Sequence, residues 1–160
     1  MMDKRAVIQL VVAKIEKDLA ALITSTKATH AEATDEQNKP ENKYDTRALE
    51  ASYLAQGQSR QVADLLKAKQ EFESLSVAES SPNDPIDVGA LLTLRRGNID
   101  TVYLLGPKAG GIEVSYEGTP VTVITPQSPI GQQLMGKVPE QSVIFQNDPD
   151  QKQFRIIRVW

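Results

Sequence analysis

The hydrophobic pattern of the chain changes its period about half-way along the sequence, and this change constrains the fold more than any other feature. Up to about residue 76, apolar residues recur at intervals of three and four, which predicts helices that pack along one face. From about residue 87, short β-branched or aromatic runs alternate with turn residues, which predicts strands. We therefore expect an α+β protein with helices over residues 3–76, a linker over 77–86 and a sheet over 87–160.

The first helical segment runs from Lys4 to about Thr34 and contains no glycine or proline. Its predicted seam alternates steps of four and three: Ile8, Val12, Ile15, Leu19, Leu22, Thr26, Thr29 and Ala33. A second segment, roughly Asn42 to Leu75, carries a matching seam: Tyr44, Ala48, Ala51, Ala55, Gln58, Val62, Leu65, Lys69 and Phe72. The alanines favour a close approach of the two helices, whereas Gly57 costs about 1 kcal/mol relative to alanine.

A polar break, TDEQNKPENKYD at positions 34–45, separates the two helical segments. Pro40 interrupts the helix there, and so short a connection favours an antiparallel hairpin, which is a two-helix coiled coil. About thirty residues per helix, at a rise of 1.5 Å, give a length of roughly 45 Å. The tip holds carboxylates that either only favour helix ends or give the tip a role in binding. They are Asp35, Glu36, Glu41 and Asp45.

The second half predicts a small, mostly antiparallel sheet with one short helix. The strand-like runs are ALLTLRR, DTVYLLG, IEVSY, TPVTVIT, SVIF and QFRIIRVW. Between them, SPIGQQLMGK has the marks of a helix: Ser128 is a good N-cap, Pro129 suits the first helical position, and Gly136 suits the left-handed residue after the last turn. The side chains expected to pack this helix on the sheet are Ile130, Leu134 and Met135.

Composition argues against several kinds of site. A net charge of -3 and a pI near 5.2 disfavour nucleic-acid binding through bulk positive charge. The absence of cysteine rules out disulfides and thiolate metal sites and is compatible with a reducing cytosol, and the single His30 cannot make a histidine zinc site. We expect His30 and Trp160 to be structural. Charged residues close the apolar run AVIQLVVA at once, so we expect a helix of a soluble protein there.

The segments SPIG at 128–131 and LMGK at 134–137, on this arrangement of hairpin and sheet, resemble the Gre family of bacterial transcript-cleavage factors, GreA and GreB. The resemblance covers nearly the whole chain. Its signature residues are Ser128, Pro129, Gly131, Gly136 and Lys137. Glu41, Asn42 and Tyr44 are similar to the tip of the family's hairpin. The resemblance implies an FKBP-like fold for the sheet half and a cytoplasmic protein.

The resemblance also implies a function. The hairpin would enter the secondary channel of RNA polymerase and assist the polymerase's own cleavage of backtracked RNA, without catalytic residues or a tightly bound cofactor of its own. Tip acids would help to hold a Mg²⁺ ion shared with the polymerase, since two metals favour phosphodiester hydrolysis. These would be Glu41 and Asp35 or Glu36, with Asp45 nearby. Nascent RNA or DNA would be contacted within the complex, and no membrane is involved.

The tip departs from the family pattern at more than one position. Asn38 stands three residues before Glu41, where the family has an aspartate, and Pro40 replaces a serine. Two interpretations stay open. Either Asp35 and Glu36 supply the missing carboxylate, or Lys39 and Lys43 neutralise the acids and the tip occupies the channel without cleavage.

Basic residues are further candidates for a surface that faces polymerase or RNA, although such residues more often form an ordinary solvated face. One set is Arg95, Arg96, Lys108, Lys137, Arg155 and Arg158 on the sheet half. The other is Arg47, Arg60 and Lys67 on the second helix. A different class of function, a prolyl isomerase or chaperone, would need an aromatic cage. The aromatic residues available for it in this half are Tyr103, Tyr116, Phe145, Phe154 and Trp160.

Overall fold

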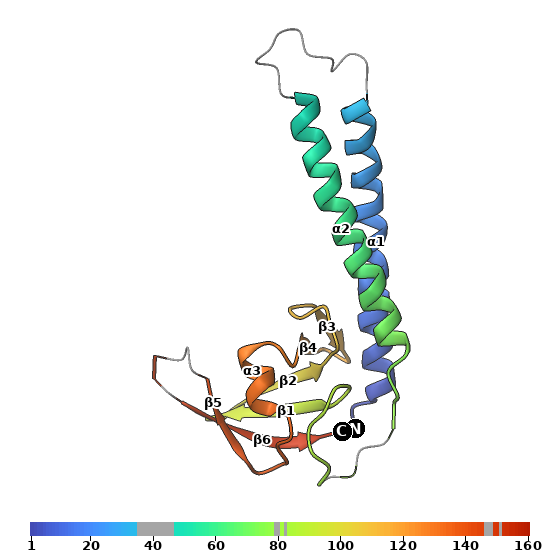
Figure 1. The fold of residues 1–160 in the computed structure, drawn as a ribbon. Helices are drawn as coiled ribbons and strands as arrows, with labels where there is room; N and C mark the ends of the chain where they lie inside the picture. The colour runs from blue at the N-terminus through green and yellow to red at the C-terminus, as the bar shows by residue number, and fades with distance from the viewer. Residues whose placement is uncertain (35–46, 79–80, 82, 146–148, 151) are drawn as a thin grey trace. The chain divides into compact units, whose positions relative to one another are not determined.

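The computed structural model describes residues 1–34, 47–78, 81, 83–145, 149–150 and 152–160. Its helices and strands follow in the order α1 (Lys4–Thr34), α2 (Arg47–Glu73), β1 (Leu91–Arg96), β2 (Ile99–Leu105), β3 (Glu113–Tyr116), β4 (Thr119–Ile124), α3 (Pro129–Leu134), β5 (Ser142–Ile144) and β6 (Gln153–Val159) (Figure 1). The α+β prediction is confirmed. Two compact units result: a hairpin unit, Ile15–Lys69, and a sheet unit, Met1–Lys14 with Gln70–Trp160.

The hairpin unit is an antiparallel pair of helices, as the sequence predicts. Near its base, Lys69 Nζ of α2 lies 3.1 Å from Glu16 Oε1 of α1. Further along, Gln58 Nε2 donates a hydrogen bond of 2.9 Å to Ser25 Oγ. Residue numbers therefore rise along α1 as they fall along α2, so α2 runs back beside α1 (Figure 1). None of the described helices is long and apolar enough to cross a bilayer.

The seam between α1 and α2 in the hairpin unit follows the predicted positions. Ile15 and Leu19 of α1 are buried, and so are Thr29 further along it and Ala51 and Ala55 of α2. The remaining predicted seam residues of this unit whose burial the structure describes are partly buried: Leu22, Thr26, Gln58, Val62, Leu65 and Lys69. The buried side chains are therefore large at residues 15–19 and small at residues 51–55.

The sheet has six strands in the order β3-β4-β2-β1-β6-β5. Among the described strands, β2 and β4 pair in parallel, and every other pairing is antiparallel. The mostly antiparallel prediction therefore holds, and each predicted strand run contains an observed strand. After β2 the chain first forms β3 at the edge of the sheet. It then returns as β4, which lies between β3 and β2 and pairs in parallel with β2.

Both faces of the sheet bury apolar side chains. On one face a core cluster comprises Ile86, Ala90, Leu92, Leu94, Leu105, Ile124, Leu134, Val143, Ile156 and Val159. Toward the other face, Phe72 of α2 packs so close to the end of β2 that a Cβ atom on Gly106 would lie 2.6 Å from its ring. Val7 and Val11 are completely buried at the start of α1, where the predicted seam had Ile8 and Val12. The start of α1 thus buries a wider face than a two-helix seam requires.

The predicted short helix is α3, and its ends are as expected. Leu134 is fully buried and Ile130 packs against the core cluster, but Met135 is 37% exposed, so its predicted packing is wrong. Met135 is the residue that caps the end of the helix, where its backbone N–H donates to Gly131 O. The predicted linker, 77–86, ends at a buried core residue, Ile86.

Candidate functional site

The candidate site is the tip of the hairpin, whose predicted metal ligands fall outside the described residues. They are Asp35, Glu36, Glu41 and Asp45, and Asn38 lies outside as well. The helices that lead into the tip end at Thr34 and begin again at Arg47. Within the described ranges, no group of three or more His, Cys, Asp or Glu side chains is placed to hold a metal ion. The shared Mg²⁺ site therefore stays a prediction about the tip.

The donor chemistry of the tip suits magnesium. Mg²⁺ prefers oxygen ligands and is commonly held by one or two carboxylates together with substrate phosphates. The sequence between α1 and α2 offers carboxylates in excess of that need, and Asn38 offers only a neutral amide oxygen. When bound, the ion would supply Lewis-acid chemistry. This chain's own contribution would be to carry carboxylates on a slender two-helix support.

The distal part of the hairpin is narrow because its seam is built from small side chains. Ala51, Ala55 and Thr29 are all at most 8% exposed. Threonine hydroxyls here turn back on their own helix, where Thr29 Oγ1 donates to Ser25 O at 2.9 Å and Thr34 Oγ1 to His30 O at 3.0 Å. His30 itself is exposed on α1.

Three large apolar side chains stand exposed near the start of α2, and the sequence reasoning missed them. Leu49, Tyr53 and Leu54 are 54%, 66% and 57% exposed. The signal was present in the predicted seam, because a helix that turns Ala51 and Ala55 inward must turn the residues between them outward. Any partner that surrounds the distal hairpin meets this apolar surface.

Two of the basic candidates on the sheet, Arg95 and Arg155, are paired with acids. Arg95 of β1 lies directly opposite Asp100 of β2. Its guanidinium donates two hydrogen bonds, of 2.6 and 2.8 Å, to the Asp100 carboxylate. That hydrogen bond and the charge of Asp100 raise the pKa of Arg95, and the bond from Arg95 lowers the pKa of Asp100. Arg155, which lies opposite Arg95 on β6, pairs with Glu140. The two arginines therefore do not form a free positive patch.

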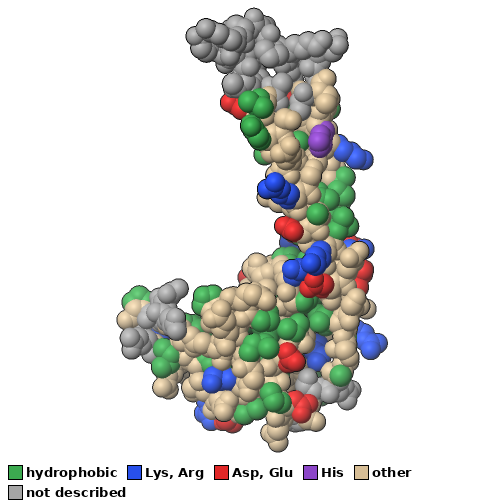
Figure 2. All heavy atoms as spheres, viewed as in Figure 1, with side chains coloured by type: hydrophobic (Ala, Val, Ile, Leu, Met, Phe, Trp, Pro, Cys, Tyr) green, Lys and Arg blue, Asp and Glu red, His purple; other side chains and the backbone are tan. Residues whose placement is uncertain are grey.

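Other basic candidates lie against aromatic rings or stand in solvent. Arg96 lies 5.7 Å from the ring centre of Phe154, and Arg158 lies 5.5 Å from that of Trp160. Arg60 is exposed on α2, and Arg47 is the first residue of that helix. On the face that Figure 2 shows, Lys and Arg side chains are dispersed among acidic ones.

Structural roles are visible for four of the five signature residues around α3: Ser128, Gly131, Gly136 and Lys137. Ser128 Oγ donates to Thr125 O at 2.7 Å and accepts from Gly131 N at 3.1 Å, so it closes the turn into the helix. A Cβ atom on Gly131 would lie 1.9 Å from Thr125 O. After the helix, Gly136 has φ +75° and donates to Ile86 O, while Lys137 O accepts from Ile86 N. The signature therefore fastens residue 86 to the end of α3.

The aromatic residues of the sheet do not gather around one cavity. The rings of Phe145 and Phe154 contact each other at a tilt of 39°, with ring centres 4.0 Å apart, and both pack with Tyr103 against the core cluster. Burial raises the pKa of the Tyr103 hydroxyl. Trp160 instead pairs through its backbone with Leu91 and lines a hollow at the start of α1. This division gives no support to a proline-binding aromatic cage.

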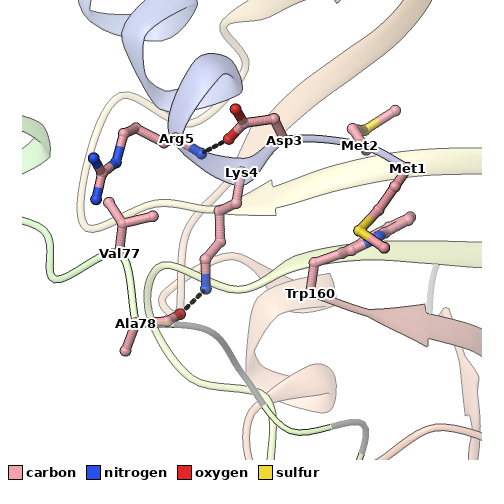
Figure 3. Close-up of a pocket in the computed structure, with 8 residues that line it drawn as sticks. All are labelled: Met1, Met2, Asp3, Lys4, Arg5, Val77, Ala78 and Trp160. Atoms are coloured by element: carbon pink, nitrogen blue, oxygen red, sulfur yellow. Dashed lines mark hydrogen bonds between the residues drawn. The ribbon is translucent and has the colours of Figure 1, made fainter.

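The hollow beside Trp160 has a volume of about 650 Å³ and lies within the sheet unit (Figure 3). The Lys4 side chain lines it, and its Nζ donates a hydrogen bond of 2.9 Å to Ala78 O. Partial burial lowers the pKa of Lys4. Asp3 is occupied in capping α1, where its Oδ1 accepts from Arg5 N at 2.9 Å. Met1 and Trp160 both line the hollow. These contacts join the start of α1 to the segment that follows α2.

No protein-family model matches the chain, and no curated protein is significantly similar to it in sequence. Solved structures do match. The neighbours include Gfh1 and GreA/GreB factors. The GreA factor homologue Gfh1 of Thermus thermophilus is 15% identical, with a TM-score of 0.38, over 93% of this chain and 94% of that one.

Gfh1 of Thermus aquaticus is 15% identical, with a TM-score of 0.38, over 92% of both chains. An elongation factor described as GreA/GreB, from Nitrosomonas europaea, is 18% identical, with a TM-score of 0.37, over 59% of this chain and 78% of that one. Likeness at this level decides neither family nor activity.

Proposed function

We propose that this protein is a Gre-type transcription factor that binds bacterial RNA polymerase and places its hairpin tip in the secondary channel. The observation that carries the proposal is the antiparallel pairing of α1 and α2, whose direction follows from the contacts Glu16–Lys69 and Ser25–Gln58. This pairing puts the carboxylate-rich connection at one end of a narrow support. The signature around α3 supports the same proposal, since Ser128 and Gly131 have the structural roles described above.

The primary form of the proposal is stimulation of transcript cleavage. Glu41, with Asp35 or Glu36, would bring carboxylate oxygens to a Mg²⁺ ion at the polymerase's catalytic centre, where two metals activate water and stabilise the leaving oxygen. The reaction would remain the polymerase's own. On this view the protein is an accessory factor and not an enzyme.

A second form is favoured by one specific residue. Asn38 stands where the family has an aspartate, and an amide brings no charge to a metal. A tip without that charge would occupy the channel and block access without cleavage, with Lys39 and Lys43 balancing the remaining acids.

The experiment that separates these forms is RNA cleavage in a purified backtracked elongation complex with Mg²⁺. The wild-type protein is compared with Glu41→Gln and with an Asp35→Asn/Glu36→Gln variant. Stimulated cleavage that these substitutions remove would support the first form. Retained binding to polymerase, with competition against an authentic cleavage factor and no cleavage, would support the second. Failure to bind polymerase at all would overturn both.

A further inference from the structure

The hairpin unit contains a polar layer at the middle of its seam. Gln58 of α2 reaches across to α1, where its Nε2 donates 2.9 Å to Ser25 Oγ. Within the described part of the chain, however, Gln58 Oε1 and Thr26 Oγ1 are buried without a hydrogen-bond partner. An oxygen that loses water on folding and gains no donor in exchange weakens the packing around it. The layer is therefore a weak point in the seam.

Packing is loose at the same level of the hairpin. A surface notch of about 230 Å³ lies beside the layer and is lined by Ile23, Thr26, Lys27, Ser59 and Val62. Gly57, next to Gln58, sits in the interior of α2, and a Cβ atom added there would meet nothing within 4 Å. A glycine inside a helix raises the cost of ordering it, and here no close packing requires the glycine.

The two sides of the layer differ in what holds them together. Toward the base, Ile15 and Leu19 are buried, and Lys69 pairs with Glu16 across the helices. Toward the tip, the buried seam consists of Thr29, Ala51 and Ala55. Small side chains bury little apolar area, so the distal part gains less from packing than the base does.

From these three observations we propose that the polar layer divides the hairpin into two cooperative segments. The distal segment comprises residues 26–34 of α1 and 47–57 of α2, and it opens and closes while the base segment, 15–24 with 59–69, stays packed. Opening begins at Gln58, because its amide and the Thr26 hydroxyl regain hydrogen bonds to water when the helices part. The tip would then be carried on a support that adapts its shape near the end.

Hydrogen exchange of backbone amides, followed residue by residue by NMR on the full chain, tests the proposal. Distal amides should exchange faster than base amides by an order of magnitude or more, because they open without the rest of the hairpin. A Thr26→Val/Gln58→Leu variant removes both unpartnered oxygens and should slow exchange of the distal amides about tenfold, with little change at the base.

Gln61→Leu is the matched control, since Gln61 is exposed on the same helix and its change adds the same apolar group outside the seam. Gly57→Ala provides an independent variant, because it should also slow distal exchange without adding any contact. Equal protection along the whole hairpin would overturn the proposal. So would distal exchange that responds to Gln61→Leu as strongly as to the variants of the layer.

Discussion

Gly131 lies so close to the backbone of Thr125 that there is no room for a side chain at residue 131. A Cβ atom there would sit 1.9 Å from the Thr125 carbonyl oxygen. We expect Gly131→Ala to lower the stability of the sheet unit by about 1–3 kcal/mol. The atoms that the new methyl group would meet belong to the Thr125 backbone, which cannot shift without disturbing the fold. Urea denaturation followed by circular dichroism measures this change. Gly57→Ala is the control, because a Cβ atom there meets open space and should not lower stability.

The contact between Gly106 and Phe72 gives a second prediction for the sheet unit. A Cβ atom on Gly106 would lie 2.6 Å from Phe72 Cζ and 2.9 Å from Val123 Cγ1, and both side chains are buried. Gly106→Ala should therefore cost about 1–3 kcal/mol. Replacing the ring with a smaller side chain, Phe72→Leu, should recover part of this loss. The double-mutant cycle should therefore give an interaction energy above about 0.5 kcal/mol between the two positions. Strict additivity of the two changes would contradict the contact.

Ser128 gives a third prediction because it both donates and accepts at the start of α3. Ser128→Ala should cost about 1 kcal/mol of stability through loss of the cap. Ser128→Asp should restore only the accepting half, because a carboxylate cannot donate to Thr125 O. Thermal unfolding of the three proteins orders them, and a Ser128→Ala protein as stable as the wild type would refute the capping role.

The pair Arg95–Asp100 predicts a dependence of stability on pH. The hydrogen bond from Arg95 lowers the pKa of Asp100 in the folded protein below its ordinary value. The ionised carboxylate therefore stabilises the fold above its unfolded pKa, and this contribution is lost as pH falls through the lower folded value. Asp100→Asn should thus reduce stability at pH 7 and have no effect once both states are protonated. Because the pair is exposed, added salt should shrink the difference.

Asn38 allows a gain-of-function prediction for the proposed cleavage role. Asn38→Asp places a carboxylate three residues before Glu41, as in the family that the sequence resembles. We expect it to increase Mg²⁺-dependent cleavage of backtracked RNA by polymerase. Asn38→Ala serves as the control, since it alters the same position without adding charge. An equal response to both substitutions would show that the charge at this position does not matter.

The sequence predicted the fold well where local rules decide it. The period of the seam places Ile15, Leu19 and Ala55 inside, and Ser128 with Pro129 marks the start of α3. Local rules failed where the outcome depends on distant segments. No local signal shows that Val7 and Val11 are completely buried, nor that β2 pairs in parallel with β4.

The candidate site was predicted less completely than the fold. Charge counts made Arg95 and Arg155 candidates, but a sequence does not reveal that Asp100 and Glu140 face them across strands and turns. The tip acids remain a prediction from the sequence. The exposed Leu49, Tyr53 and Leu54 follow from the seam once its inward face is known, which makes them a foreseeable omission.

The first measurement to make is the position of the hairpin tip on RNA polymerase. Because the chain has no cysteine, Gln37→Cys can carry a tethered iron chelate that cuts nearby protein and nucleic acid, with Gln153→Cys on β6 as the control. The account predicts that the chelate at residue 37 cuts next to the polymerase's catalytic centre and that the chelate at residue 153 does not. Binding to polymerase with cuts from residue 37 only on the outer surface would contradict it.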